Sequence, residues 1–386
     1  MNIAMFSDTY EPQVNGVVTM LKMLERELTS LGHSVYVVTV DHPKADPKDN
    51  VYRTYSLRFP QEKQHRIGLP FDYKEIISHM NKWKIDLIHT HSLVVLGYTG
   101  NIVAKYFKIP NVTTYHTLMV EYAHYVPVIT GIIRKFLKSE SKNFCNRNRA
   151  VIAPSIKTKN ILRSYGVTVP IEVIPNGIDI EKVQHKFTEE EKKNFKLRFG
   201  IKENDKVLIF VGRLGQEKSI DVLFENIAKL VRNTDQNIKF LLVGDGPMKE
   251  KLIRLTKKLR IEDNVIFTGY LDWPKEISLA YQCSDMFIMA SKTETFGLVT
   301  LEAICNGLPV VAFDDPCIYG MVEHGVNGYL NPDDKLLHEN ILELIGNPQK
   351  CEKMSEKSLE MCQAFTGRQN ALKTIDLYER VLKDEI

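Results

Sequence analysis

The stretch Val173-Ile-Pro-Asn-Gly-Ile-Asp179 decides how this chain of 386 residues folds. Its proline lacks a backbone N–H and ends the apolar run before it, and the Asn-Gly pair that follows favours a turn. A single core rarely holds so long a chain, so this break predicts a boundary between two domains. We expect domains at 1–178 and 179–364, with the helical segment 365–386 a candidate to pack back onto the first.

Short apolar runs alternate with helix-length amphipathic stretches on both sides of this boundary. That alternation is typical of doubly wound parallel sheets, in which a helix follows each strand. Two such series predict two Rossmann-like α/β domains. The strands expected before the boundary are Asn2–Phe6, Ser34–Thr39, Leu87–His89, Asn111–Tyr115, Ala150–Ala153 and Ile171–Ile174. Those expected after it are Val207–Val211, Lys239–Val243, Asn264–Thr268, Met286–Met289 and Pro309–Ala312.

The composition argues against several classes of protein. Apolar residues make up 44% of the chain and charged residues 26%, and no apolar run approaches the roughly 20 residues that a membrane span needs. Residues Met1–Asp8 lack a basic segment and are expected to form a strand, not a signal peptide. Six scattered cysteines without a C-x-x-C pair predict reduced thiols in a cytoplasmic protein, with no metal or disulfide framework.

Positive charge is concentrated in the first half of the chain. Residues 1–180 contain 22 Lys and Arg against 15 Asp and Glu, and the remainder contains 29 against 33. The first domain is therefore the candidate to meet an anionic partner. Nucleic acid is not expected as a partner, because the basic residues are not interleaved with aromatic residues in a recognised module.

Ligands of open α/β sheets bind beyond the carboxyl ends of the strands, so the loops at those ends are the candidate functional segments. Gly212-Arg213-Leu-Gly215-Gln-Glu-Lys218 follows the first strand of the second domain. A guanidinium and an ammonium on such a loop can hold a diphosphate from two sides. Two solvated surface cations are the alternative interpretation.

The segment Ser291-Lys-Thr-Glu-Thr-Phe-Gly-Leu-Val-Thr-Leu-Glu302 is expected to contain a strand end, a glycine turn and the start of a helix. Glu294 lies in the loop, where it can accept hydrogen bonds from hydroxyls. The turn Thr295-Phe296-Gly297-Leu298 presents backbone N–H groups at a helix N-terminus, which favours a bound phosphate. Glu302 lies about one turn into the helix and can face the same pocket. Alternatively, Glu294 caps the helix and Glu302 is solvated.

Three other loops contain glycines that could approach a ligand. Gly269-Tyr270 can hold a nucleobase through its backbone and side chain, or form a plain β-turn. Gly244-Asp-Gly-Pro247 is predicted to be a tight turn. Asn15-Gly16 opens a helix, so its backbone can approach a phosphate closely, or Asn15 can simply cap that helix.

Histidines follow two strands of the first domain. His116 comes directly after the expected strand Asn111–Tyr115, where it can contact a substrate or move a proton. His89 and His91 also lie near a strand end, and for them we expect packing or capping.

Several motifs are missing from the chain, and their absence narrows the chemistry. It contains no G-x-x-x-x-G-K-[ST], no G-x-S-x-G and no H-E-x-x-H. It also lacks D-x-D, the usual carboxylate pair for a metal bound to a nucleotide-sugar diphosphate. We therefore expect no metal or other cofactor, and a departing diphosphate would be stabilised by fixed cations and a helix N-terminus.

Taken together, these motifs resemble the retaining glycosyltransferases of family 4, which have the GT-B fold. The resemblance covers nearly the whole chain and rests on the order and spacing of its motifs. They are Asn15-Gly16-Val17, His116, Val173–Asp179, Gly212-Arg213 with Lys218, Gly244–Pro247, and Glu294-x7-Glu302 followed by Gly307-Leu-Pro-Val310. The fold implied is two Rossmann-like domains that face each other across a cleft.

The resemblance also implies roles for individual residues. Arg213 and Lys218 would bind the donor diphosphate, aided by backbone N–H groups near Gly16 and Gly297. Glu294 would hold sugar hydroxyls. Three further roles follow: Glu302 would hold the ribose, His116 would lie beside the transferred sugar, and His116, Arg213, Lys218 and Glu294 would form the catalytic set.

Enzymes of this family retain the anomeric configuration without an obvious protein nucleophile. The acceptor is thought to attack on the face from which the diphosphate leaves. This chain fits that pattern, because no carboxylate stands out as a nucleophile in the loops of the first domain. Glu11 and Glu121 are the nearby candidates, and both are weak.

The stretch Tyr115-His-Thr-Leu-Met-Val-Glu-Tyr-Ala-His-Tyr125 is further similar to bacterial synthases that glucosylate diacylglycerol, although Met119 and Val120 depart from their pattern. This similarity implies transfer of glucose from UDP-glucose to a lipid acceptor. Three alternatives remain open: a GDP-mannose donor with a phosphoinositide acceptor, a soluble or polysaccharide acceptor, and a UDP-sugar epimerase of the same fold. A non-catalytic nucleotide-sugar binder is disfavoured by the presence of both cations and both glutamates.

A basic amphipathic helix is expected between Thr130 and Arg149. Such a helix can lie on an anionic membrane, which predicts peripheral association with the inner face of the cell membrane. The alternative is a helix packed on the core with a solvated basic side. One helical face can hold Ile132, Ile133, Phe136, Leu137 and Phe144. The positive charges are Arg134, Lys135, Lys138, Lys142, Arg147 and Arg149, with Glu140 against them.

Overall fold

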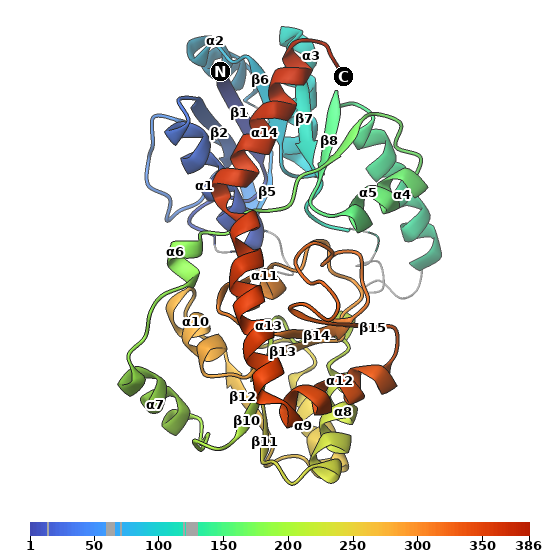
Figure 1. Ribbon diagram of the computed structural model, residues 1–386. Coiled ribbons are helices and arrows are strands. Elements are labelled where there is room, and N and C mark those ends of the chain that lie inside the picture. Colours follow the sequence, from blue (N-terminus) through green and yellow to red (C-terminus); the bar gives the residue numbers. More distant parts are fainter. Residues whose placement is uncertain (14, 59–65, 70–71, 119, 121–129) are drawn as a thin grey trace. The chain divides into compact units, whose positions relative to one another are not determined.

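The computed structural model describes residues 1–386 except 14, 59–65, 70–71, 119 and 121–129. It divides into two compact units, Met1–Gly177 with Gly367–Ile386, and Ile178–Thr366. Figure 1 colours the chain along its sequence, so that the C-terminal segment of the first unit is red beside blue and green elements. The chain therefore passes from one unit to the other twice.

Among the described residues, the first unit has a seven-stranded parallel sheet in the order β3-β2-β1-β6-β7-β8-β9. The order reverses between β1 and β6, which is the switch point of a doubly wound sheet. Strands β4 and β5 form a separate antiparallel pair. The strands are β1 Asn2–Ser7, β2 Ser34–Val40, β3 Val51–Thr54, β4 Ser56–Arg58, β5 Arg66–Gly68, β6 Leu87–Thr90, β7 Asn111–Thr114, β8 Ala150–Ala153 and β9 Ile171–Val173.

Helices cover both faces of this sheet because successive residues of a strand point to opposite sides. Ile3 and Met5 of β1 pack with α1 and α14, while Ala4 and Phe6 pack with α2 and α3. Both sets are fully buried. The helices of this unit are α1 Gly16–Ser30, α2 Tyr73–Trp83, α3 Val95–Phe107, α4 Thr130–Cys145, α5 Ile156–Ser164 and α14 Gly367–Leu382.

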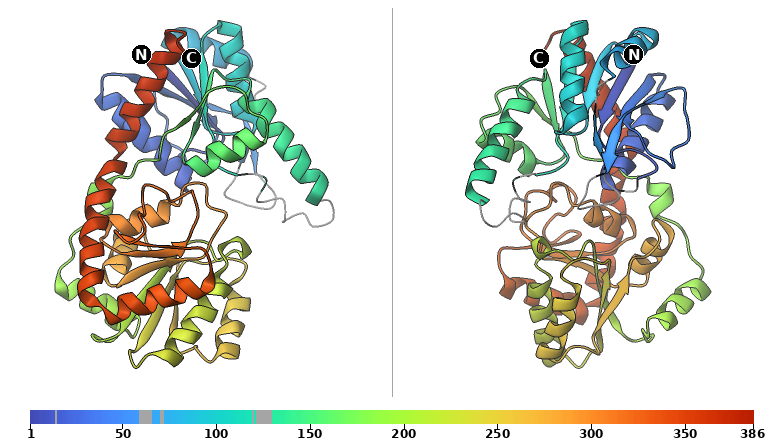
Figure 2. Two further views of the ribbon diagram at one scale, coloured as in Figure 1. Left: turned by 45° about the vertical axis from the view of Figure 1, so that its right-hand side comes forward. Right: turned by 180° about the vertical axis from the view of Figure 1, so that it is seen from behind.

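Helix α14 lies against α1 in the first unit (Figures 1 and 2). The two connections between the units run side by side, because a Cβ on Gly177 would lie only 2.7 Å from the Cα of Gly367. Glycine at both positions allows this close approach of two backbones. One residue further along, the Ile178 N–H donates to the carbonyl of Phe365 at 2.8 Å.

The second unit has a parallel sheet in the order β12-β11-β10-β13-β14-β15, with its switch point between β10 and β13. Val207 and Ile209 of β10 pack toward α10 and α11, and Leu208 and Phe210 pack toward α8, α9 and α12. The strands are β10 Lys206–Val211, β11 Ile238–Val243, β12 Val265–Gly269, β13 Met286–Met289, β14 Val310–Phe313 and β15 Gly328–Asn331. The helices are α6 Ile180–Val183, α7 Glu189–Arg198, α8 Ile220–Asn233, α9 Lys249–Leu259, α10 Lys275–Gln282, α11 Leu298–Cys305, α12 Asp334–Gly346 and α13 Pro348–Met361. The 3₁₀ helices Gln216–Lys218 and Cys362–Phe365 complete the unit.

The prediction of two doubly wound α/β domains is confirmed. The sequence did not predict β3, β4, β5 or β15, which are short strands at or beyond the edges of the sheets. Each of these strands has only three or four residues and mixes apolar residues with polar residues or glycine, so the continuous apolar pattern of a buried parallel strand is absent there. Within the described part of the chain, no helix is long and apolar enough to cross a bilayer.

Candidate functional site

Lys218 and Glu294 meet at the switch point of the second sheet. Lys218 ends the 3₁₀ helix in the loop after β10, and Glu294 lies in the loop after β13, the neighbouring strand. The ammonium and the carboxylate form an ion pair, and their side chains are only 19% and 16% exposed. Arg213 is exposed on the same loop as Lys218. The structure thus brings together two residues that are 76 positions apart in the sequence.

Hydroxyl groups connect the two loops. Ser291 and Thr293, both in the loop after β13, donate from their side chains to the carbonyl of Glu217 at 3.3 and 3.2 Å. Glu217 directly precedes Lys218, so these bonds fix the backbone that positions the ammonium. Neighbouring strand ends and two hydrogen bonds therefore define the separation of Lys218 and Glu294.

The turn Gly244–Pro247 packs against the loop Gly212–Lys218, which we call the arginine loop because it contains Arg213. The Leu214 N–H donates to the carbonyl of Asp245 at 3.0 Å, and the Met248 N–H donates to the carbonyl of Leu214 at 3.0 Å. A Cβ on Gly246 would lie 2.6 Å from that same Leu214 carbonyl. The glycines here allow backbone to pack on backbone, which is a structural role for a turn that the sequence predicted to be tight.

Helix α11 begins at the turn that was predicted to hold a phosphate. Gly297 has φ of 75°, in the left-handed region, and a Cβ there would lie 2.9 Å from Ile318 Cγ2. The amide groups of Leu298 and Val299 open the helix, where N–H groups have no acceptor within the helix itself. Phe296 is 5% exposed and belongs to the hydrophobic core, so only its backbone can contribute to a ligand site.

Glu302 lies on α11 with its carboxylate held by neighbouring side chains. The Trp273 indole Nε1–H donates to Glu302 Oε1 at 3.0 Å. The Tyr281 hydroxyl lies 3.4 Å from Oε2 and 3.0 Å from the carbonyl of Val299. Glu302 is 7% exposed, and this burial raises the pKa of its carboxyl from 4.5 to about 7. The alternative of a solvated Glu302 is wrong, and a ribose would have to share this carboxylate with Trp273.

We expect the Glu302→Gln variant to lose a pH dependence of stability that the native protein has. The raised pKa, from 4.5 to about 7, means that the folded state binds this proton more tightly than the unfolded chain does. This stabilisation is complete at a pH below the pKa of Glu302 in the unfolded chain, and it is lost as the pH rises through the pKa of Glu302 in the folded protein. The free energy of unfolding changes by about 3 kcal/mol over this range. Glutamine keeps the acceptor for Trp273 and does not titrate.

Urea unfolding at about pH 5 and about pH 8 measures this difference. The chain contains two tryptophans, so in a Trp83→Phe background the fluorescence of Trp273 reports on the second unit alone. If the free energy of unfolding changes equally with pH in the native protein and in the Glu302→Gln variant, Glu302 does not take up a proton on folding.

The loop after β12 contains the predicted nucleobase contacts. Gly269 has φ of 71°, and its carbonyl accepts from the Gly244 N–H at 2.9 Å. Tyr270 is 80% exposed, which makes it one of the most exposed aromatic side chains among the described residues. Its ring is therefore accessible to a ligand, and its backbone lies next to the Gly244 turn.

In the first unit, His116 belongs to a row of three histidines. His116 Nε2 lies 3.1 Å from His91 Nδ1, and the rings of His89 and His91 have centroids 3.9 Å apart. His89 is bonded at both nitrogens, through Nδ1 to the Tyr378 hydroxyl at 2.6 Å and through Nε2 to Thr114 Oγ1 at 2.7 Å. Tyr378 comes from α14, so the C-terminal helix helps to hold the row.

Burial keeps these imidazoles neutral. It lowers the pKa of His89 to about 3 and the pKa of His116 to about 4, and the pKa of His91 also lies well below its usual range. His89 and His91 are buried, in agreement with the packing role expected for them, while His116 is partly exposed. At neutral pH His116 can therefore offer a neutral imidazole to a ligand but no positive charge.

The same chain matches known proteins over nearly its full length. Residues 14–182 match the family model described as Glycosyltransferase Family 4, and residues 191–361 match the model described as Glycosyl transferases group 1. The alpha-monoglucosyldiacylglycerol synthase of Streptococcus pneumoniae is 32% identical, over 95% of this chain and 84% of that protein. The chain belongs to the family 4 glycosyltransferases.

Other relatives agree with this assignment. The alpha-monoglucosyldiacylglycerol synthase of Acholeplasma laidlawii is 30% identical, over 90% of this glycosyltransferase and 89% of its own length. The crystal structure of Anabaena HepE in complex with UDP-glucose superposes with a TM-score of 0.76 at 20% identity, covering 98% of this chain and 99% of the other. The fold is therefore GT-B, with two Rossmann-like domains.

Helix α4 of this glycosyltransferase has an exposed apolar pair within a basic surface. Ile132 is 72% exposed and Phe136 is 61% exposed, one helical turn apart. The expectation of one shared apolar face is wrong at Phe144, which is fully buried in the core with Tyr115. The helix thus packs through its C-terminal half and leaves its N-terminal half uncovered within the described part of the first unit. The predicted membrane cations Arg134, Lys135, Lys138 and Lys142 all lie on this helix, and all four are exposed.

The remaining candidates have simpler roles. Asn15 caps α1, because its side chain accepts from the Val18 N–H at 3.0 Å, and Gly16 is the first residue of that helix. Glu11 forms ion pairs with Lys22, at 2.6 Å, and with Lys48. Two lysine partners make the Glu11 carboxylate a poor nucleophile. Glu121 lies outside the described residues.

Asp8 is a partly buried acid that the sequence pattern did not single out. It follows β1 and accepts from the Ser92 hydroxyl at 2.5 Å and from the Leu96 N–H at 3.1 and 3.2 Å. Burial raises the pKa of Asp8 above its usual range, although these hydrogen bonds lower it. Its position directly after the first strand, at the switch point of the first sheet, is the signal that could have identified it. Asp8 fixes the start of α3 beside His91.

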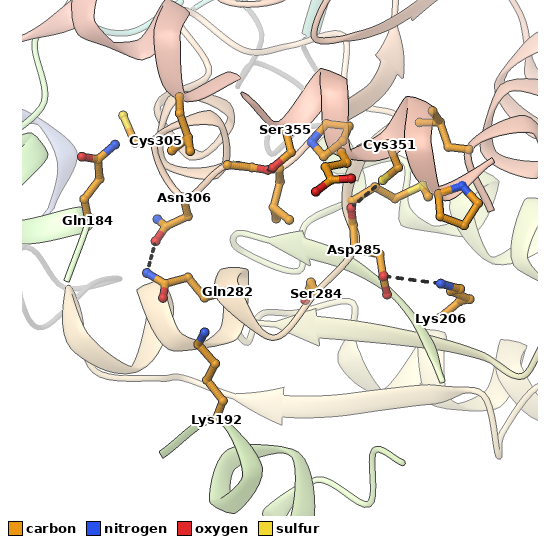
Figure 3. A pocket seen from close by; sticks show the side chains of 18 of the residues that line it. Gln184, Lys192, Lys206, Gln282, Ser284, Asp285, Cys305, Asn306, Cys351 and Ser355 are labelled. Atoms are coloured by element: carbon orange, nitrogen blue, oxygen red, sulfur yellow. Dashed lines mark hydrogen bonds and ion pairs between the residues drawn. The ribbon is translucent and has the colours of Figure 1, made fainter. Parts of the chain in front are cut away.

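A groove of about 680 Å³ in the second unit lies away from these residues (Figure 3). Its lining includes Lys206, Asp285 and Pro309, which stand at the amino ends of β10, β13 and β14. Figure 3 shows Lys206 facing Asp285 and Gln282 facing Asn306. The Gln282 side-chain amide donates to Asn306 Oδ1 at 3.0 Å. The donor motifs lie at the opposite, carboxyl ends of the same strands, so this groove is not the predicted donor site.

Proposed function

We propose that this protein is a retaining hexosyltransferase that transfers glucose from UDP-glucose to diacylglycerol in a membrane. The observation that supports this most strongly is its identity of 32% and 30% to two alpha-monoglucosyldiacylglycerol synthases, over 95% and 90% of the chain. The structural neighbour HepE was solved with UDP-glucose bound, and its similarity supports the fold of a donor site. The acceptor is inferred from the two synthases.

In this proposal the switch point of the second unit binds the donor diphosphate. Arg213 offers a planar fork of N–H donors and Lys218 a compact charge. The start of α11 adds backbone N–H groups, near Gly297 and Leu298, and a positive helix end. These fixed positive groups neutralise the departing diphosphate without a metal ion or another cofactor. Because Lys218 is paired with Glu294, the bound diphosphate and Glu294 would share one ammonium.

The other roles follow the family resemblance. Glu294 accepts hydrogen bonds from the sugar hydroxyls, and Glu302 accepts from the ribose. The backbone of Gly269 and the ring of Tyr270 contact the base, and Gly16 contributes a backbone N–H to the phosphates. His116 is assigned to the transferred sugar as a neutral hydrogen-bonding group. The acceptor hydroxyl attacks on the face from which the diphosphate leaves, so the anomeric configuration is retained.

The lipid acceptor requires access to a membrane, and α4 provides a suitable surface. Ile132 and Phe136 can enter the boundary between headgroups and acyl chains, while the lysines of the same helix attract anionic headgroups. The exposure of both apolar side chains supports this role, because a helix packed for stability alone would bury them. We infer peripheral association of a cytoplasmic protein with the inner face of the cell membrane.

The donor and acceptor are tested together with radiolabelled UDP-glucose, UDP-galactose and GDP-mannose, each offered with vesicles that contain diacylglycerol and anionic lipid. We expect the UDP-glucose label alone to become soluble in organic solvent. A labelled product from GDP-mannose would identify that nucleotide sugar as the donor in place of UDP-glucose. A water-soluble product would identify a soluble acceptor in place of the lipid. Epimerised sugar formed without any acceptor would identify an epimerase and overturn the proposal.

Reversing three lysines of α4 to glutamate is expected to weaken vesicle binding strongly. Each basic residue near an anionic surface contributes about 1 kcal/mol, so the loss of Lys135, Lys138 and Lys142 alone should lower the partition coefficient about 100-fold. Sedimentation with vesicles of phosphatidylcholine and phosphatidylglycerol measures this coefficient. Unchanged sedimentation would rule out α4 as the membrane surface.

The matched control reverses three exposed lysines elsewhere in the first unit, Lys44, Lys74 and Lys82, and changes the net charge by the same amount. A second variant, Ile132→Ser with Phe136→Ser, keeps all charges and removes the apolar pair. It should sediment less while unfolding at the same urea concentration, because side chains that are 72% and 61% exposed contribute little to the core.

A further inference from the structure

A pocket of about 850 Å³ lies at the amino edge of the first sheet, at the opposite end of β7 from His116. It is bordered by the end of α3, the starts of β7 and β8, and the end of α14. These elements lie at the same edge of the first unit in Figures 1 and 2. The residues that the proposed function assigns to the donor and to the membrane surface do not line this pocket. Arg147 and Arg149 do line it, and the expectation that they belong to the basic helix is wrong, because α4 ends at Cys145.

The pocket lining is strongly positive. Lys105 and Lys108 come from the end of α3, and Arg147 and Arg149 come from the segment between α4 and β8. Among the described lining residues the one acid is Asp384, which forms an ion pair with Arg149. The lysines at the end of α3 are also favoured there by the helix dipole, but that explanation does not reach the two arginines, which lie outside any helix.

A buried asparagine lies in the wall of this pocket. Asn101 is 8% exposed and lines the pocket, and its Nδ2 group has no hydrogen-bond partner among the described residues. Its orientation is fixed, because Asn111 Nδ2 donates to Asn101 Oδ1 at 2.8 Å and to Asn148 Oδ1 at 2.8 Å. Exchanging the two atoms of the Asn101 amide would place two N–H groups against each other. The unsatisfied group is therefore a donor, and it is enclosed beneath the surface of the lining.

We propose that this pocket binds a phosphate group that carries a short organic substituent. The two arginines supply planar N–H forks, which match phosphate oxygens, and the two lysines add charge. Ile102 and Leu382, both exposed in the lining, border the space for the substituent. A glycerol phosphate has this chemistry, either free in solution or as the headgroup of an anionic lipid.

In this arrangement the carboxylate of Asp384 competes with the phosphate for Arg149. Its carboxylate is 78% exposed and paired with Arg149, so an incoming phosphate displaces it at little cost. Asp384 has φ of 60°, a left-handed conformation that asparagine also tolerates. The Asp384→Asn variant therefore removes the competing charge without straining the backbone, and it should bind the phosphate more tightly.

Calorimetric titration of the full chain with sn-glycerol 3-phosphate tests the site without any activity assay. We expect binding to weaken about tenfold or more in the Arg147→Gln, Arg149→Gln double variant, because each arginine makes charge-assisted hydrogen bonds. Asp384→Asn should bind several-fold more tightly.

The controls are Lys82→Gln, an exposed lysine in the last turn of α2, and Asp49→Asn, an exposed carboxylate of the same unit. Both should bind as the native chain does. Vesicles of phosphatidylcholine and phosphatidylglycerol in equal parts form the second arm. If binding of sn-glycerol 3-phosphate depends on Arg147 and Arg149, the ligand is a free phosphate ester. If only binding to the vesicles depends on these arginines, the ligand is a lipid headgroup. The proposal is overturned if neither arm depends on these arginines, or if Lys218→Ala abolishes binding and they do not, since the phosphate would then occupy the proposed donor site.

Discussion

The Lys218→Ala variant is expected to lose about 100-fold in kcat/KM with the preferred nucleotide-sugar donor. Its ammonium is held at the carboxyl edge of the second sheet by Glu294 and by the loops that Ser291 and Thr293 join. A positive group fixed before the reaction begins stabilises the charge that develops on a leaving diphosphate, and removing one such group typically costs 10²- to 10³-fold in rate, on the order of 3 to 4 kcal/mol. Steady-state kinetics with labelled donor and lipid vesicles measure the loss.

Arg213→Ala and Glu294→Ala should also lose activity, and the Lys218→Ala, Glu294→Ala double variant separates chemistry from stability. Because the two residues form an ion pair, the effects of the single variants should not add. A matched control is Lys350→Ala, which breaks a comparable ion pair with Glu343, of 2.6 Å, elsewhere in the second unit. If kcat/KM of the Arg213, Lys218 and Glu294 variants stays within about threefold of native, a difference below about 1 kcal/mol, these residues do not form the donor site. If unfolding free energies fall while kcat/KM does not, the ion pair is only structural.

The fold was predictable because buried parallel strands have a strong sequence pattern. Val207–Val211 is apolar throughout, since both faces of β10 are covered by helices, and the structure extends that strand by one residue only. Gly328–Asn331, by contrast, contains a glycine and an asparagine and was missed. A Cβ on Gly328 would lie 2.2 Å from the carbonyl of Val310, so the residue that weakens the pattern is the one that lets β15 approach β14.

The candidate site was predictable where topology alone brings residues together. Lys218 and Glu294 follow strands on either side of a switch point, so their proximity follows from the strand order. The partners of Glu302 were not predictable in this way. Trp273 lies late in the loop between β12 and α10, and Tyr281 lies within α10. Their contacts with Glu302 therefore depend on how α10 packs against α11.

The contact between His91 and His116 was predictable only in part. His89 pairs with Val112 across β6 and β7, and this register brings the residues after Thr90 beside those after Thr113. His91 and His116 are therefore neighbours because of the register, although they are 25 positions apart in the sequence. Sequence periodicity predicts that a strand exists but not its register against the next, so the contact between the two rings could not be foreseen.

The Gly244→Ala variant is expected to destabilise the second unit by about 3 kcal/mol or more and to lower donor-dependent activity with it. Gly244 has φ of 128°, and a Cβ there would lie 2.0 Å from the carbonyl oxygen of Gly212. The obstacle is backbone, so no side chain can rotate away, and both strain and overlap must be relieved by moving the strand ends. Gly212 directly precedes Arg213, and any shift of that carbonyl displaces the loop that contains Arg213 and Lys218, the two cations proposed to bind the donor.

The control is the same substitution at Gly346, at the end of α12, where a Cβ would have none of the described atoms within 4 Å. Alanine there should leave stability unchanged or raise it slightly, since it reduces the freedom of the unfolded chain. Urea unfolding followed by Trp273 fluorescence in the Trp83→Phe background compares both variants. A Gly244→Ala protein as stable as the Gly346→Ala protein would show that the turn can move away from Gly212. If that protein also kept its full kcat/KM, the arginine loop would not need the Gly244 turn for its position, and Arg213 would have to be held by contacts within its own loop.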